Sequence, residues 1–238
     1  MKAIEVNNLF FEYQNNQVFQ DLSLQIQPQE KVGLIGANGA GKTTLFFSIC
    51  GLLPSVTGEI KLFNKIVETG HFYPEIGLVF QNPDDQLFSP TVKDDITFGA
   101  ENLGLSSEKI TERLEAVLKT TGVEYLLDRV PYQLSGGEKC MVAIASVLIM
   151  NPQIILYDEP SANLDLKARR KLINFLKSLP QTIVVSSHDL EMILEVCDRV
   201  IVMNLGEIVA DGKPSEIMSN QQLMQDNNLE VPLSLRSD

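Results

Sequence analysis

Nine consecutive residues, Gly36 to Thr44, carry the clearest chemical pattern of the chain. They read Gly-Ala-Asn-Gly-Ala-Gly-Lys-Thr-Thr and match the phosphate-loop pattern G-x-x-x-x-G-K-[ST] in full. Glycines let such a loop turn its backbone N–H groups toward phosphate oxygens. Lys42 would reach the β- and γ-phosphates, and the Thr43 hydroxyl would ligate Mg²⁺. The segment also follows a predicted strand and opens a predicted helix, so pattern and context together favour a site for a nucleoside triphosphate over a simple glycine-rich turn.

A second segment with features of an anion-binding helix start is Leu134-Ser135-Gly136-Gly137-Glu138. Ser135 is placed to cap the helix that follows, and Glu138 three residues later can reach back to it, which is a capping box. Two glycines in the first turn leave N–H groups bare at the positive end of the helix. In isolation the segment would be read as an ordinary helix cap. Together with the phosphate loop, it predicts a second phosphate seat on the same chain.

Two adjacent carboxylates, Asp158 and Glu159, follow the apolar run 154–157. A parallel strand ending there would place them at the carboxyl edge of the sheet, where Asp158 could hold Mg²⁺ and Glu159 could address an attacking water. The alternative is that these acids simply lie in a loop before a helix that starts after Pro160. The presence of a phosphate loop in the same chain makes this alternative the weaker one. The stretch Asn64-Lys65-Ile66-Val67 begins a guanine-recognition pattern but lacks its final aspartate, which favours ATP over GTP.

The elements that must position these residues alternate between strand and helix. Residues 18–27 alternate as a half-buried strand, and residues 93–150 are mostly helical. Further strands are predicted at 31–35, 58–63, 75–80, 154–157, 182–186, 199–203 and 207–211, and helices at 42–50, 165–178 and 189–196. The β-α-β-α-β order after residue 153 predicts a parallel sheet, so residues 84–151 are expected to be a helical insertion.

Composition limits the remaining choices. The chain has 238 residues, 21% of them charged, and a net charge of −12, which argues against nucleic acid or anionic lipid as its main partner. Its three cysteines lie far apart and form no metal-binding pattern, so free thiols in a reducing compartment are expected. No apolar run has the length of a signal peptide or a membrane span. We therefore expect a cytoplasmic protein that meets a membrane only through a partner.

The phosphate loop, Leu134–Glu138 and the Asp158–Glu159 strand occur together and in this order, with a helical stretch between them. This combination resembles the nucleotide-binding subunit of an ABC transporter, and the resemblance spans about residues 3–212. It implies an α/β fold of the P-loop NTPase (ABC ATPase) class, with a mostly parallel core sheet, an antiparallel β lobe and an inserted α-helical subdomain. A single ATPase domain over 1–238 would comprise a core with the β lobe (1–83 and 152–212), the insertion (84–151) and a short tail (213–238).

The resemblance also implies a role for each site residue. Tyr13 would stack on adenine, although alone it could be a core aromatic. Glu159 would polarise the attacking water and, with Lys42, serve catalysis; His188 would hold the γ-phosphate, although alone it could simply start a helix. The phosphates would be bound by Gly36, Asn38, Gly39, Ala40, Gly41, Lys42, Thr43 and Thr44. Mg²⁺ would be bound by Thr43, Gln81 and Asp158. The ATP of an opposite subunit would be contacted by Ser135 and Gly137, and Glu138 is counted with these nucleotide-binding residues.

A finer resemblance lies in the segment Phe80–Phe88, which reads Phe-Gln-Asn-Pro-Asp-Asp-Gln-Leu-Phe, and in Thr97-Phe98-Gly99. Both are similar to the ATPases of energy-coupling-factor (ECF) importers, which take up vitamins or transition metals such as cobalt and nickel. The resemblance implies a peripheral ATPase on the cytoplasmic face of the membrane, paired with a second ATPase subunit, identical or paralogous. It also implies an integral membrane coupling subunit and a membrane subunit that binds the substrate. The alternatives are another ABC transporter and a soluble ABC ATPase without a transport role.

Overall fold

The core of the protein is a six-stranded, mostly parallel sheet. The computed structural model describes residues 1–14, 16–54 and 57–236, and none of the predicted site residues lies in the gaps. The strand order is β10-β9-β3-β8-β7-β6, and only β10 runs antiparallel to its neighbour. These strands are β3 (Lys31–Ile35), β6 (Ile76–Val79), β7 (Ile154–Asp158), β8 (Thr182–Ser186), β9 (Arg199–Asn204) and β10 (Glu207–Gly212).

The central strands are apolar on both faces because each face packs on its own core. In β7, Ile155 and Tyr157 enter the core shared with the helical elements, whereas Ile154 and Leu156 enter the core shared with the β lobe. This double burial explains why the strand reads as a continuous apolar run rather than as an alternation. Such a strand ends in polar residues only where it leaves the core, and β7 ends in Asp158.

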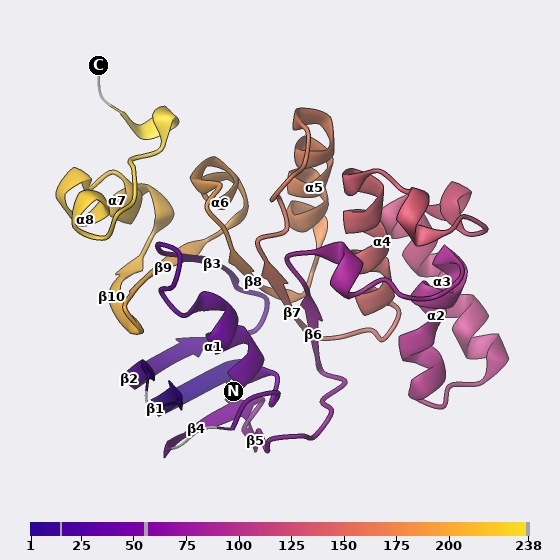
Figure 1. The fold of residues 1–238 in the computed structure, drawn as a ribbon, viewed down its shortest axis with the longest axis horizontal. Coiled ribbons are helices and arrows are strands. Elements are labelled where there is room, and N and C mark those ends of the chain that lie inside the picture. The colour runs from indigo at the N-terminus through magenta and orange to yellow at the C-terminus, as the bar shows by residue number, and fades with distance from the viewer. Residues whose placement is uncertain (15, 55–56, 237–238) are drawn as a thin grey trace.

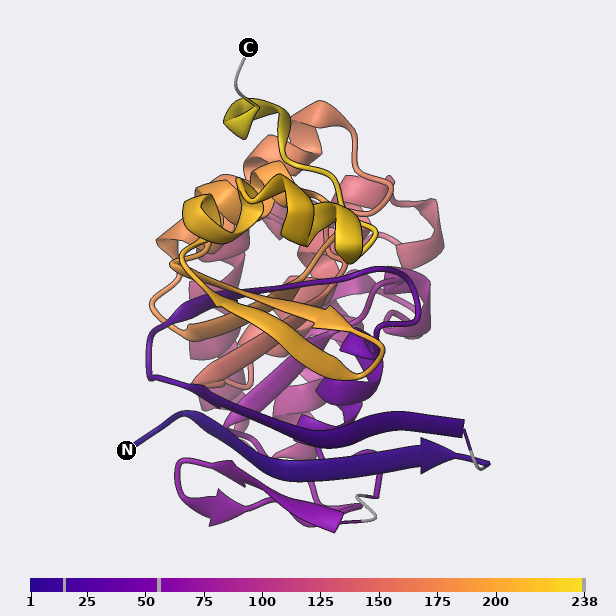
Figure 2. The ribbon, with the colours of Figure 1, turned by 90° about the vertical axis from the view of Figure 1, so that its left-hand side faces the viewer.

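A separate four-stranded antiparallel sheet, ordered β2-β1-β4-β5, packs below the core sheet in Figure 1 and is seen along its length in Figure 2. Its strands are β1 (Ile4–Tyr13), β2 (Asn16–Ile26), β4 (Thr57–Leu62) and β5 (Lys65–Ile66). The alternation predicted for β2 is confirmed, since Leu22, Leu24 and Ile26 are all buried. Strand β1 was not predicted, because bulges and a positive φ of 49° at Asn8 interrupt its alternation.

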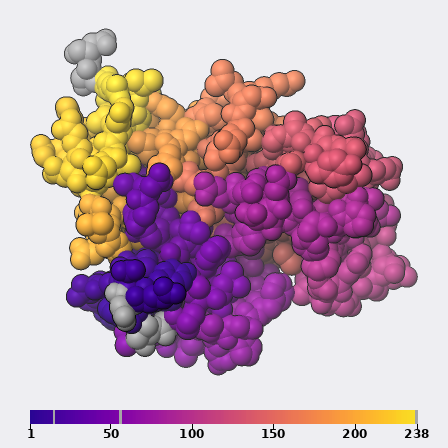
Figure 3. Space-filling view, viewed as in Figure 1, coloured from indigo at the N-terminus to yellow at the C-terminus, as the bar shows by residue number. Residues whose placement is uncertain are grey.

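The helical insertion lies at the far side of the molecule from β1 and β2 (Figures 1 and 3). It contains α2 (Val92–Asn102), α3 (Ser107–Thr121), α4 (Gly136–Leu148) and the short turns η1 (Pro83–Asp85), η2 (Glu124–Leu126) and η3 (Pro131–Gln133). The helical spacing of Ile110, Leu114, Val117 and Leu118 in the sequence predicts an apolar stripe, and it is confirmed: Leu114, Val117 and Leu118 are buried in the core that α4 shares, and Ile110 packs against it partly buried. Helix α4 packs against both α2 and α3.

The remaining helices cover the core sheet and carry the C-terminus. They are α1 (Lys42–Ile49), α5 (Leu166–Ser178), α6 (Leu190–Val196), α7 (Pro214–Met218), α8 (Gln221–Asp226) and η4 (Leu233–Leu235). The tail returns to α6, where Ser234 donates to Glu191 from its backbone and its hydroxyl. Among the described residues, no helix has the length and apolar character needed to cross a bilayer.

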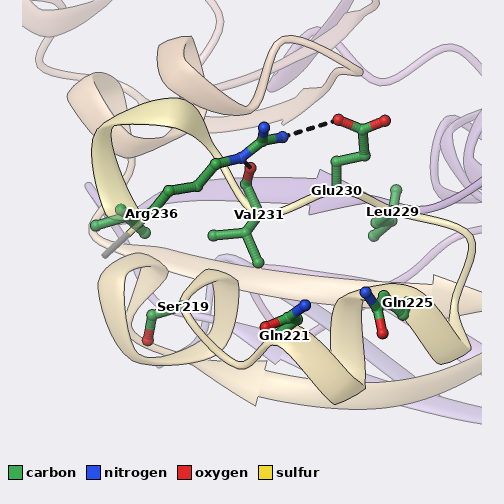
Figure 4. A pocket seen from close by; sticks show the side chains of 8 residues that line it. Ser219, Gln221, Gln225, Leu229, Glu230, Val231 and Arg236 are labelled. Atoms are coloured by element: carbon green, nitrogen blue, oxygen red, sulfur yellow. Dashed lines mark hydrogen bonds and ion pairs between the residues drawn. The ribbon is translucent and has the colours of Figure 1, made fainter. Parts of the chain in front are cut away.

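A hollow of about 560 Å³ lies between α7, α8 and the tail (Figure 4). Arg236 crosses it to Glu230, with 2.9 Å between Nη2 and Oε2, and also donates to the Val231 carbonyl. Its lining includes Gln221 and Gln225 but none of the predicted site residues. This hollow is therefore separate from the predicted chemical site.

Candidate functional site

The phosphate loop joins β3 to α1 and leaves the start of α1 open. Gly41 occupies the N-cap position with a φ of 103°, a backbone conformation that residues other than glycine rarely adopt. A Cβ at Gly41 would also lie 2.7 Å from the ring of Phe19. No side chain caps α1, so its first backbone N–H groups face a pocket of about 280 Å³. The lining of this pocket is Val18, Asn38 to Thr44, Gln81, Asp158, Glu159 and His188.

Lys42 is folded back over the loop in the interior of this pocket. Its ammonium donates to the Gly36 carbonyl at 2.8 Å and to the Ala37 carbonyl at 3.4 Å, and lies 3.8 Å from Oε1 of Glu159. Burial lowers the pKa of Lys42, and the charges of Glu159 and Asp158 oppose that shift. A cation that has lost so much water is stabilised by any anion that enters the pocket, which is what a triphosphate would supply.

Asp158 is held by hydroxyl groups on both sides. Thr43 donates to its Oδ2 at 2.7 Å, and Ser186 donates to its Oδ1 at 2.5 Å. Strand pairing explains the second contact, because Asp158 and Ser186 lie opposite one another at the carboxyl ends of β7 and β8. The prediction that Asp158 emerges at this edge beside the phosphate loop is therefore confirmed by the geometry.

Glu159 is held by hydrogen bonds as Asp158 is, and its backbone is in a strained conformation. Its φ is 47°, and its backbone N–H donates to both the carbonyl and the hydroxyl of Ser186 at 3.0 Å. The backbone N–H of His188 donates to Oε2 at 3.0 Å. The other oxygen, Oε1, is buried, accepts no hydrogen bond from a described residue, and lies 3.4 Å from Nε2 of His188. A positive φ costs free energy at a residue other than glycine, and here the hydrogen bonds from Ser186 and His188 hold Glu159 in that conformation.

His188 completes this side of the pocket. Its Nε2 lies 2.9 Å from Oδ1 of Asn38, which joins the loop after β8 to the phosphate loop. The predicted residues Asn38, Lys42, Thr43, Gln81, Asp158, Glu159 and His188 all line the same pocket.

Leu134–Glu138 forms the capping box that its sequence predicts. Ser135 accepts from the backbone N–H of Glu138, and Glu138 accepts from the Ser135 backbone at 2.9 Å and hydroxyl at 2.7 Å. Those hydrogen bonds, first from the hydroxyl and then from the backbone, lower the pKa of Glu138. The segment opens on a hollow of about 660 Å³, which it shares with Tyr125 and with α5.

The two glycines of this segment differ in their surroundings. A Cβ at Gly137 would lie 2.7 Å from the Cβ of Ala168 on α5, whereas at Gly136 the nearest atom would be the Asn163 carbonyl oxygen at 3.6 Å. Gly137 is therefore required for the close approach of α4 and α5. The hollow here shares no residue with the phosphate-loop pocket, so the two predicted anion sites of one chain lie in separate hollows.

Tyr13 lies at the end of β1 and is 45% exposed, with its ring edge-on to Phe11 at 4.7 Å. It is not among the residues that line the phosphate-loop pocket, so its role in stacking on adenine stays a prediction.

Sequence reasoning missed Ser186, which holds Asp158 and Glu159 together, and the ion pair of Arg169 with Asp189 beside His188. Ser186 was detectable in principle, because it ends the strand predicted to lie beside 154–157. The Arg169 contact joins two helices and has no local sequence signal.

Comparison with known proteins agrees with this geometry. The family model described as ABC transporter matches residues 19–162. A putative ABC transporter ATP-binding protein of Synechocystis sp. is 54% identical over 235 residues, covering 98% of this chain and 83% of the relative. The energy-coupling factor transporter ATP-binding protein EcfA of Carboxydothermus hydrogenoformans is 40% identical over 241 residues, covering 98% and 89%.

Among solved structures, cbiO1 of Clostridium perfringens, which is part of the ABC transporter complex cbiONQ, superposes with a TM-score of 0.84. It is 34% identical, and the match covers 95% of this chain and 94% of cbiO1. The chain therefore belongs to the ATP-binding proteins of ABC transporters, and it is an ATPase that couples the hydrolysis of ATP to transport.

Proposed function

We propose that this ATPase powers an ECF-type importer and that the imported substrate is a transition metal ion, such as cobalt or nickel, or a vitamin. Two observations support the proposal: relatives named as ECF ATPases match nearly the whole chain, and a solved neighbour belongs to a cbiONQ complex. The cargo itself would be bound by a separate membrane subunit, so this chain would set the energy supply and not the specificity.

In the proposed reaction the protein holds charge in place, as in other phosphoryl transfers. The N–H groups at the start of α1 and the Lys42 ammonium would bind the phosphates. The free Oε1 of Glu159 would accept a hydrogen bond from the attacking water, since its other oxygen is already occupied by His188 N–H. His188 would hold the γ-phosphate, with Asn38 keeping its ring at the pocket wall.

The residues present fit Mg²⁺. The hydroxyl of Thr43 and the carboxylate of Asp158 are 2.7 Å apart at the pocket, and Gln81 adds an amide oxygen to its lining. These are hard oxygen donors, and they are few, as expected for an ion that keeps water and binds phosphate oxygens. When bound, Mg²⁺ would neutralise charge on the β- and γ-phosphates. Ser186 would orient Asp158 for this role by its hydrogen bond to the other carboxylate oxygen.

The observation that supports a dimeric working unit is that the two proposed anion sites share no lining residue. One ATP molecule cannot use both seats of one chain. Two ATPase subunits facing each other would place Ser135 and Gly137 of one against the ATP held by Lys42 of the other. We therefore propose that the working unit is a dimer that sandwiches two ATP molecules.

The membrane partner would dock beside the turn η1. Gln86 fixes this turn to α4 through the Ala143 carbonyl and the Ser146 hydroxyl, and Lys139 of α4 reaches Asp84 at 2.6 Å. Directly after the turn, Phe88 is 68% exposed and stacks edge-on with Phe98, which is 44% exposed. Exposed aromatic pairs are typical of protein contact sites. We propose that helices of a membrane coupling subunit cover them on the cytoplasmic face.

The test of the catalytic assignment is Glu159→Gln. The amide keeps the acceptor for His188 N–H but cannot polarise water as a carboxylate does. We expect ATP binding and ATP-dependent dimerisation to persist while phosphate release falls by at least a hundredfold, roughly what loss of a general base costs. Glu115→Gln, on the exposed face of α3, is the matched control and should turn over normally. Unchanged turnover in Glu159→Gln would reject Glu159 as the base.

A second experiment separates the transporter from a soluble ABC ATPase. The affinity-tagged protein, purified from detergent-solubilised membranes of its own host, should retain an integral membrane subunit. Recovery of the ATPase in the soluble fraction alone, without any membrane subunit, would contradict the importer proposal.

A further inference from the structure

His188 is carried by a short loop between β8 and α6, and its two neighbours anchor that loop. Ser187 is buried, and its hydroxyl accepts from the backbone N–H of Asp189 at 3.0 Å. Asp189 is the N-cap of α6 and accepts from Met192 N–H at 3.0 Å. The position of the His188 backbone therefore depends on how firmly Asp189 and Ser187 are held.

Arg169 of α5 holds Asp189 with both arms of its guanidinium. Its Nη2 donates to Oδ1 at 2.7 Å, and its Nε donates to Oδ2. Each side chain is only 21% exposed, so water screens this pair less than an ion pair on the open surface. A two-pronged contact fixes direction as well as distance, which a single-point lysine contact would not do.

The same part of α5 also touches the other anion seat. Ala168, the neighbour of Arg169, faces Gly137 of the Leu134–Glu138 segment. The loop before α5 adds a further link, because the hydroxyl of Ser161 lies 3.4 Å from that of Ser187. The first turn of α5 is thus in contact with both the wall that carries His188 and the helix that carries the second seat.

We propose that Arg169 is a positioning residue for ATP hydrolysis: it ties His188 to α5 through Asp189. The inference rests on the proposed role of His188 at the γ-phosphate. Arg169 touches no phosphate in this scheme. It acts by keeping the loop 187–189 in the conformation in which His188 N–H donates to Glu159 and Nε2 faces Asn38.

The chain supplies a matched control in the next residue. Arg170 also joins α5 to α6, through Glu195 at 2.5 Å, but this pair is more exposed and lies near the far end of α6. Arg169→Ala and Arg170→Ala each remove one ion pair between the same two helices. Only Arg169→Ala releases the residue that follows His188.

The kinetic test measures turnover and ATP affinity separately. We expect Arg169→Ala to lower kcat by roughly tenfold to a hundredfold, since small displacements of a reacting constellation have effects of that size. The dissociation constant for ATP should change less than about threefold, because the phosphate loop does not depend on this contact. Arg169→Lys should recover part of the turnover, and Arg170→Ala should behave as the unaltered protein.

NMR signals of the histidine rings report the environment of the His188 side chain directly. The chain has only two histidines, so selective labelling gives one signal set for His188 and one for His71. His71 lies beside Glu68 in the segment between β5 and β6 and serves as the internal reference. In nucleotide-free protein, Arg169→Ala should shift the His188 ring signals and leave those of His71 in place, and Arg170→Ala should shift neither.

Each result decides the proposal. A selective loss of kcat with shifted His188 signals supports it. Equal losses in Arg169→Ala and Arg170→Ala would overturn it, because the effect would then be general packing of α5 on α6. Unshifted His188 signals in Arg169→Ala would also overturn it, and Arg169→Gln, which removes the charged two-pronged contact but keeps most of the side chain, carries the same test if the alanine variant does not fold. Normal turnover of His188→Ala would instead reject the proposed role of His188, while the NMR comparison would still judge the contact.

Discussion

The close contact between Gly137 and Ala168 allows a quantitative prediction of why the segment Leu134–Glu138 contains glycine at position 137. A Cβ at Gly137 would meet the Cβ of Ala168 at 2.7 Å, closer than two carbons normally approach. Forcing extra volume into a packed contact costs about 1–3 kcal/mol, whereas alanine in place of glycine in a helix gains about 1 kcal/mol. Gly137→Ala should therefore lower the free energy of unfolding by about 1 kcal/mol.

Removing the opposing methyl group should reverse this loss. Ala168→Gly alone costs about 1 kcal/mol in helix propensity. In the double variant Gly137→Ala/Ala168→Gly the clash is absent and the propensity terms cancel, so its stability should equal that of the unaltered protein. The two single losses would add to about 2 kcal/mol, so the double-mutant cycle should give a coupling of about 2 kcal/mol.

Thermal unfolding followed by circular dichroism measures the cycle. For a chain of this length, 1 kcal/mol corresponds to about 2–4 °C in Tm. Gly136→Ala is the control, because its Cβ would meet nothing closer than 3.6 Å, and it should be neutral or slightly stabilising. Phosphate release should fall in Gly137→Ala and return in the double variant. Additive losses of stability in the double variant would refute the packing argument.

Two further predictions concern the metal ligand and the thiols. Thr43→Val keeps the size of the side chain but removes the hydroxyl that donates to Asp158. The Mg²⁺ concentration for half-maximal turnover should therefore rise at least tenfold in Thr43→Val and stay near normal in Thr43→Ser. Equal Mg²⁺ dependence in the two variants would contradict the assignment. Burial raises the pKa of Cys140 and Cys197 to about 12, so on the order of one thiol in ten thousand is a thiolate at pH 8. A thiol-specific chromogenic reagent should therefore modify these two buried residues only after unfolding, whereas Cys50 is partly exposed. Rapid modification of Cys140 or Cys197 in the native protein would refute the burial argument.

Much of the site was predictable because its residues lie in contiguous motifs at strand ends. Lys42 and Thr43 begin α1 after the loop that follows β3, Asp158 is the last residue of β7, and Glu159 follows it. The carboxyl ends of neighbouring parallel strands meet at one edge, so reading the strands correctly is enough to bring these residues together. The same logic extended to β8 places Ser186 and His188 there as well.

Other features had no local signal. Strand β1 escaped prediction because its bulges break the two-residue period that identifies a half-buried strand. The pairing of Arg169 with Asp189 depends on how α5 and α6 pack on the sheet, and surface arginines and aspartates are common in any helix. The glycine at 137 reads as a nucleotide contact in sequence, whereas its fit against Ala168 becomes visible only when α4 and α5 are placed together.

The path of the chain from Glu159 to Arg169 connects the phosphate-loop pocket with the hollow at Leu134–Glu138. Glu159 lines the phosphate-loop pocket, Asn163 and Ala168 line the hollow at Leu134–Glu138, and Arg169 returns to the loop that carries His188. Because Arg169 follows Ala168 directly, the first turn of α5 contacts both the helix that begins at Leu134–Glu138 and, through Asp189, the loop that carries His188. This connection runs along one helix turn and does not pass through the core sheet, so a change in the packing of α5 is expected to affect the two sites together.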